Sequence, residues 1–206
     1  MKIFEYGDTA AKTVLIQPVD DHDMSGLAVE IAEIQRFIDT NFSFLAVKVD
    51  NWNYDLSPWV APAVFGDEAF GDGAKETLTE ILRLCWDSSK SYFLGGYSLA
   101  GLFSLWAAYQ TEIFTGIAAA SPSVWFPGFA EYMRTNNIQS PKVYLSLGDK
   151  EEKTKNPVMA KVGDCIREGY DLLCRQGINS TLEWNRGGHF KEPELRTARA
   201  FAWVLK

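Results

Sequence analysis

Ser98 lies in a segment whose residue types suit nucleophilic catalysis. An apolar run, Ser91 to Gly95, leads into Gly96-Tyr97-Ser98-Leu99-Ala100-Gly101 and then into an apolar helical pattern. A serine held at a sharp strand-to-helix turn has a strained backbone, so the residues two before and two after it must be small. Gly96 and Ala100 meet that need, although Ala100 replaces the second glycine of the common G-x-S-x-G form. The pattern predicts a nucleophile elbow at Ser98, and a chance glycine-rich turn before a helix is the alternative interpretation.

An activated serine normally needs an imidazole to take its proton, and the chain has two histidines. His189 follows a strand-like segment that ends at Trp184, and it precedes a helical pattern from about Glu194 to Leu205. His22 lies among three aspartates near the start of the chain, which is typical of a solvated loop or a helix N-terminus. We therefore predict that His189 is the base.

A carboxylate between the nucleophile and the histidine would hold the imidazole in the correct tautomer. The strand-like segment Lys142 to Leu147 ends in Gly148-Asp149-Lys150-Glu151-Glu152. Glu151 lies three residues after Gly148, the spacing of a G-x-x-D or G-x-x-E turn, and is the first candidate. Asp149 is the second candidate and Glu152 the third. A Ser-His dyad without an acid is a further possibility.

The elements that position these side chains alternate along the chain between strand-like and helix-like patterns. This alternation predicts an α/β fold with a mostly parallel sheet covered by helices on both faces, as one domain over residues 1–206. The predicted strands are Thr13 to Val19, Phe44 to Val49, Ser91 to Gly95, Phe114 to Ala120, Lys142 to Leu147 and Thr181 to Trp184. The predicted helices are about Gly26 to Phe37, Lys75 to Cys85, Gly101 to Gln110, Pro157 to Gln176 and Glu194 to Leu205.

In that order Ser98, Glu151 and His189 all follow the carboxyl ends of strands, where open α/β sheets bind ligands. The loop after the first predicted strand reaches the same edge. A backbone N–H from that loop, of Val19 or Asp20, would complete an oxyanion hole with the N–H of Leu99. We take Asp20 as the second donor on position alone.

The segment Ala120-Ser121-Pro122-Ser123-Val124-Trp125-Phe126 adds a family signal to Gly96–Gly101 and Gly187-Gly188-His189. It is similar to an S-P-S-x-W-W segment, and most of the chain resembles the esterase group of the α/β-hydrolases that includes esterase D-like and enterochelin esterase-like proteins. The resemblance implies an α/β-hydrolase fold and hydrolysis of carboxylic esters through an acyl-serine intermediate, with no metal or organic cofactor. The chain is short enough to lack a large cap domain, which leaves the substrate open.

A long loop from Asp50 to Gly66 is rich in aromatic residues and prolines, and such loops often build binding sites. Its aromatic side chains, together with Trp125, could form a wall around the substrate. Packing of the loop onto the domain is an equal alternative, and a homodimer contact is a third use. The candidates for the wall are Trp52, Trp59 and Trp125, with Tyr54 and Phe65 beside them.

Composition argues against two classes of partner, and the resemblance implies a small-molecule ester as the partner. The net charge of −7, without a cluster of lysines and arginines, argues against nucleic acid and against an anionic membrane surface. Cys85, Cys165 and Cys174 have no metal-ligand spacing, and we interpret them as structural thiols. The first residues lack a secretory signal pattern, which favours a cytoplasmic location. An acyltransferase on the same fold and a non-catalytic binding module remain as alternatives.

Overall fold

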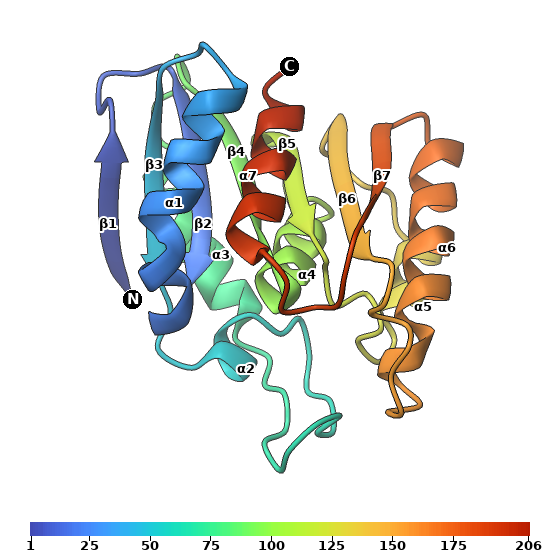
Figure 1. Cartoon of the computed structure of the whole chain (residues 1–206). Coiled ribbons are helices and arrows are strands. Elements are labelled where there is room, and N and C mark those ends of the chain that lie inside the picture. Colours follow the sequence, from blue (N-terminus) through green and yellow to red (C-terminus); the bar gives the residue numbers. More distant parts are fainter.

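A single seven-stranded sheet organises the molecule, and the computed structural model describes all residues from 1 to 206 (Figure 1). The strand order is β1-β3-β2-β4-β5-β6-β7, and every neighbouring pair is parallel except β1 with β3. The strands are β1 (Lys2–Gly7), β2 (Thr13–Val19), β3 (Phe42–Lys48), β4 (Ser91–Tyr97), β5 (Phe114–Ala120), β6 (Lys142–Gly148) and β7 (Asn179–Asn185).

Helices cover both faces of this sheet and create two separate hydrophobic cores. They are α1 (Asp21–Phe37), α2 (Trp52–Asp55), α3 (Ala74–Leu84), α4 (Ser98–Ala107), α5 (Phe129–Thr135), a short 3₁₀ helix (Met159–Lys161), α6 (Val162–Arg175) and α7 (Pro193–Val204). One core lies under α1 and α7 and includes Leu15 of β2, whereas its neighbours Val14 and Ile16 point into the other core, under α3 to α6. Because both faces are covered, the central strands are apolar at nearly every position.

The expected fold class is confirmed: a mostly parallel sheet carries helices on both faces, and all six predicted strands are present. The additional strand β1 was not predicted. It pairs only with β3 at the edge of the sheet, and its residues are mostly exposed, so its sequence lacks the buried alternation that marks a half-buried strand.

Helices α1, α2, α5 and α6 differ from the predictions. The short helix α2 was not predicted, and α6 begins at Val162 rather than Pro157, after the 3₁₀ turn Met159–Lys161. Helix α1 begins at Asp21 rather than Gly26, because Asp20 and Asp23 form a capping box at its N-terminus. Helix α5 was not predicted; it follows a turn at Gly128, whose φ is 83°. None of the helices combines the length and the hydrophobicity that crossing a membrane would require.

Between β3 and α3 the chain leaves the sheet for residues 49–73. This segment contains α2 and an irregular loop that projects beyond the carboxyl ends of the parallel strands in Figure 1. It is the loop that the sequence marks as aromatic and rich in proline. No separate cap domain covers the strand ends, so the candidate site lies at an open edge.

Candidate active site

Ser98 is the first residue of α4 and directly follows β4, so it sits at the turn itself. Its φ is 55°, in the left-handed region that a residue with a side chain rarely occupies. A Cβ at Gly96 would lie 2.6 Å from the Ala100 Cβ, which explains why a glycine is needed before the serine. Local geometry thus agrees with a nucleophile elbow, and the alanine in place of the second glycine fits.

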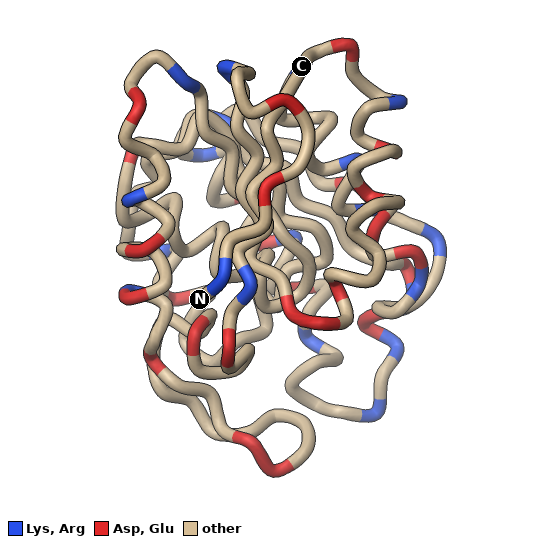
Figure 2. Tube along the Cα trace, turned by 90° about the vertical axis from the view of Figure 1, so that its left-hand side faces the viewer, with Lys and Arg blue, Asp and Glu red and all other residues tan.

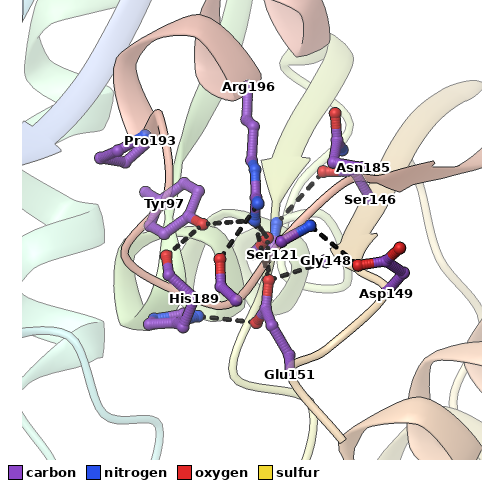
Figure 3. A network of polar contacts seen from close by, with 12 residues as sticks. Tyr97, Ser121, Ser146, Gly148, Asp149, Glu151, Asn185, His189, Pro193 and Arg196 are labelled. Carbon is purple, nitrogen blue, oxygen red and sulfur yellow. Dashed lines mark hydrogen bonds and ion pairs between the residues drawn. The ribbon is translucent and has the colours of Figure 1, made fainter.

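His189 and Glu151 reach Ser98 from two different loops. His189 Nε2 lies 3.0 Å from Ser98 Oγ, and His189 Nδ1 lies 2.7 Å from Glu151 Oε2. Glu151 comes from the turn after β6, and His189 comes from the loop between β7 and α7 (Figure 3). The structure therefore brings together the three residues that the sequence placed first.

The Glu151 carboxylate is held by several donors in addition to His189. Its Oε1 accepts hydrogen bonds from the Gly148 N–H at 2.7 Å, the Ser121 hydroxyl at 2.9 Å and the Arg196 guanidinium at 2.9 Å. Burial alone would raise the pKa of Glu151, but the hydrogen bond and charge of His189, with the bonds from Gly148 and Ser121, outweigh it and lower the pKa. The carboxylate is therefore kept ionised beside the imidazole.

Arg196 links this carboxylate to the loop that carries His189. Its side chain is 2% exposed, and its nitrogen atoms also donate to the Tyr97 hydroxyl and to the Gly188 carbonyl, each at 3.0 Å. The Tyr97 hydroxyl in turn donates to the His189 carbonyl at 2.7 Å. Figure 3 shows the guanidinium between Tyr97 and Ser121. Sequence reasoning did not single out Arg196, Tyr97 or Ser121, because nothing local marks contacts between such distant segments.

The two alternative acids point elsewhere. Asp149 is exposed and accepts a hydrogen bond from the Gly187 N–H at 2.8 Å, which lowers its pKa and ties the β6 turn to the histidine loop. Glu152 forms an ion pair with Arg167 of α6 at 3.1 Å. Neither carboxylate bonds to His189, so of the three acids only Glu151 meets the imidazole.

Of the two expected oxyanion donors, the Leu99 N–H has no partner within its helix, whereas the Asp20 N–H already donates a hydrogen bond. Leu99 is the second residue of α4, where a backbone N–H has no helical carbonyl to bond. The Asp20 N–H donates to Asp23 Oδ2 within the capping box, at a long distance of 3.3 Å. An oxyanion would have to share that N–H with the Asp23 carboxylate.

A cavity of about 160 Å³ opens beside the nucleophile. Trp52 forms part of its wall, as expected, and Phe190 stands at 92% exposure with its ring edge-on to His189. Sequence reasoning missed Phe190, although an aromatic residue directly after the predicted base was a usable signal. The lining residues are Asp20, His22, Asp23, Trp52, Tyr97, Ser98, His189, Phe190 and Pro193.

The other two tryptophans of the expected wall lie outside this cavity, which corrects that expectation. Trp59 packs on Phe126 and Phe129, and its indole N–H donates to the Pro127 carbonyl at 2.8 Å. Trp125 is buried against Phe65 and Phe70. Both side chains fasten the 49–73 segment to the domain, which was the alternative interpretation; the homodimer contact stays a prediction.

The remaining side chains with metal or redox chemistry form no cluster. No group of three or more histidine, cysteine or acidic side chains is arranged to hold a metal ion. The three cysteines are free thiols: Cys85 is buried, Cys165 half-buried and Cys174 exposed. Burial raises the pKa of Cys85 to about 12, so that thiol is unreactive.

The sheet, the elbow after β4 and the loops after β6 and β7 define the α/β-hydrolase fold. No family profile and no curated protein matches the sequence. Among solved structures, the chain is similar to the siderophore hydrolase EstA from Aspergillus nidulans, with a TM-score of 0.71 and 19% identity over 98% of this chain and 88% of that one.

Two bacterial structures share the fold at lower identity. An IroE-like serine hydrolase from Shewanella oneidensis gives a TM-score of 0.75 at 13% identity, covering 98% of this chain and 74% of that one. The enterobactin esterase FES from Shigella flexneri gives 0.65 at 11% identity, and there this chain spans only 54% of the other. At these identities the likeness establishes the fold.

Proposed function

We propose that this protein is a serine esterase that cleaves a carboxylic ester through an acyl-serine intermediate. The observation that carries the proposal is the unbroken line of contacts from Ser98 Oγ to His189 Nε2, at 3.0 Å, and from His189 Nδ1 to Glu151 Oε2, at 2.7 Å. The order and roles are those of a Ser-His-acid triad. Similar solved structures that are named as esterases and hydrolases support the same reaction class.

In this mechanism Ser98 attacks the ester carbonyl while His189 takes the hydroxyl proton. Backbone N–H groups of Leu99 and Asp20 hold the developing oxyanion. His189 then gives its proton to the departing alcohol, and water repeats the sequence to release the acid. Glu151 stabilises the imidazolium at each stage, because its carboxylate already accepts from Nδ1.

The contacts around the triad suit a base that must keep its orientation. Tyr97 fixes the backbone of His189, and Arg196 fixes both Tyr97 and Glu151. The imidazole itself is 23% exposed in its side chain, so water can reach it for the second half of the reaction. The cavity beside it is small and open, which suits a small-molecule ester.

Labelling with a fluorophosphonate probe, read by intact mass, tests the proposal. We expect one adduct on the wild type and none on Ser98→Ala, and we expect labelling of His189→Ala to be slowed by several orders of magnitude. A panel of short-chain esters should show the same order of activities. A folded wild-type protein that forms no adduct and hydrolyses none of the esters would contradict the proposal and favour a binding module.

A further inference from the structure

One wall of the catalytic cavity is acidic. Asp20 and Asp23, at the start of α1, line the cavity with Ser98, and no lysine or arginine lines it. The two stretches of chain that supply this wall, residues 13–35 and 49–74, contain no lysine or arginine at all. In Figure 2 the loop that projects lowest in the view has Asp and Glu as its only charged residues, without lysine or arginine.

Behind this wall lies a second, much smaller hollow with unpaired polar atoms. It has a volume of about 10 Å³, room for about one water-sized group, and shares His22, Asp23, Tyr97 and Pro193 with the catalytic cavity. Gln17 and Glu30 also line it; they are 3% and 4% exposed, and Gln17 Oε1 and Glu30 Oε1 have no hydrogen-bond partner. Buried acceptors are almost always paired, so these two point to a missing donor.

No lysine or arginine pairs with the acidic groups around the cavity and the hollow, and His22 is the basic side chain that lines both beside Asp23. Asp20, Asp23, Glu30 and Glu194 take part in no ion pair, whereas their neighbour Asp21 pairs with Lys48. Glu194, at the start of α7, packs so closely on α1 that a Cβ at Gly26 would collide with its side chain. Helices α1 and α7 thus both contribute carboxyl groups to the lining of the hollow.

We propose that the ester substrate carries a primary ammonium group, which binds at this acidic wall, contacting Asp23 and reaching the acceptors of Gln17 and Glu30. This inference rests on the proposed esterase activity and names its substrate class. A primary ammonium brings three N–H donors in a group about the size of a water molecule, which matches the acceptors and the volume of the hollow. A trimethylammonium group has no N–H to donate and is too large for that space.

The ionisation of the wall agrees with this role. Burial, with the nearby charges of Asp20 and Glu194, raises the pKa of Asp23 to about 6, so the carboxylate is largely charged at neutral pH. Burial raises the pKa of Glu30 well above its usual range, and Asp23 and Glu194 add to that effect. The carboxyl groups of Asp23 and Glu30 can together accept hydrogen bonds from a single ammonium.

A series of phenyl esters tests the inference. Each acyl chain ends in a primary ammonium, and each ester is paired with the alkanoyl ester that has a methyl group in its place, with the trimethylammonium ester and with the carboxylate ester. For at least one chain length we expect kcat/KM of the ammonium ester to exceed that of its methyl partner by about tenfold or more at low salt. The trimethylammonium and carboxylate esters should fall below the ammonium ester, and added salt should shrink the preference.

Two variants locate the effect. Asp23→Asn should abolish the preference; because the ratio of two esters is measured on one protein, any general change in the nucleophile cancels. Asp21→Asn removes an equal charge two residues away, outside the cavity, and should keep the preference. An equal ratio for all chain lengths, or a preference that survives Asp23→Asn, would overturn the inference while leaving the esterase intact. If no ester of any charge is hydrolysed, the proposed function fails and the inference falls with it.

Discussion

Glu151 and Glu30 are both buried glutamates near the same cavity, yet their surroundings differ sharply. Glu151 is bonded by His189, Arg196, Ser121 and the Gly148 N–H, and its pKa is lowered in spite of burial. Glu30 meets only the Gln17 amide, at 3.4 Å, and burial raises its pKa. Partners, not depth, decide in which direction the pKa of a buried carboxyl group moves. The Glu151 side of the cavity thus has an arginine paired with its carboxylate, whereas the acidic side, with Asp23 and Glu30, has no lysine or arginine.

The largest effect should come from removing the charge of Glu151, on the side of the cavity where the carboxylate is paired. Glu151→Gln should reduce kcat by roughly a thousand- to ten-thousandfold, because the imidazolium loses its stabilising carboxylate and the tautomer is no longer fixed. Steady-state kinetics on a short-chain ester measure this. A loss smaller than about tenfold would instead mean that Ser98 and His189 work as a dyad.

Removing Arg196, the cation paired with Glu151, should lower the stability of the protein. Arg196→Gln leaves the Glu151 carboxylate buried without its guanidinium, and we expect a loss of about 3–5 kcal/mol in the free energy of unfolding at neutral pH. Because the pKa of Glu151 is lowered on folding, its stabilisation exists above its ordinary value and is lost as pH falls through the folded pKa. The gap between variant and wild type should therefore narrow in acid.

Urea titrations at several pH values measure that gap. Arg134→Gln is the matched control, since Arg134 pairs with Glu131 and Glu168 on the exposed surface and its loss should hardly change stability. Equal losses of unfolding free energy in the two variants would mean that the buried ion pair stabilises the protein no more than an exposed one does.

On the acidic side of the cavity, removal of a charge should change stability in the opposite direction. Asp23→Asn removes an unpaired charge, so we expect the variant to be about 1–2 kcal/mol more stable than wild type at pH 8. Since folding raises the pKa of Asp23 to about 6, its contribution to stability is complete below its ordinary value of 3.8 and is lost as pH rises through about 6. The advantage of the variant should thus vanish near pH 4.

Thermal or urea unfolding of both proteins across that pH range tests this. Asp21→Asn, which changes an exposed carboxylate paired with Lys48, should show no comparable pH-dependent gain. A variant less stable than wild type at pH 8 would show that the Asp23 charge is compensated after all.

The smallest effects on activity should come from changing the two acids that contact neither His189 nor the acidic wall, Asp149 and Glu152. Asp149→Asn and Glu152→Gln should keep kcat/KM close to the wild-type value, because neither carboxylate meets His189. Assaying them beside Glu151→Gln sharpens the assignment. A loss in Asp149→Asn as large as that in Glu151→Gln would move the role of the acid to Asp149.

The sequence was informative where function depends on local geometry. The strand, the small residues around Ser98 and the G-x-x-E turn at Gly148 each act within a few residues, so their pattern could be recognised directly. The contacts of Arg196 with Tyr97 and Glu151 join residues 99 and 45 positions apart, and no local pattern encodes them.

The aromatic residues show a different limit. Composition marks residues 50–66 as a loop rich in aromatic residues, but it does not say which rings pack on the domain and which line a site. Trp52 lies in the short helix α2 beside the cavity, whereas Trp59 turns toward Phe126 and α5. That choice depends on the tertiary packing of helices that were themselves predicted only in part.

The position of Arg196 in α7 also means that the active site is complete only when the end of the chain has folded. Ser98 and its strand occupy the middle of the chain, but the base and the guanidinium that steadies its loop come 91 and 98 residues later. Closing the long loops between such distant residues is entropically costly, so these contacts depend on the rest of the fold. Helix α7 packs on α1, β4, β5 and β6, so its contacts come from both the first and the second half of the chain. A folding intermediate with α7 undocked would hold a formed elbow and an inert serine, and catalytic activity would therefore report on completion of the whole fold.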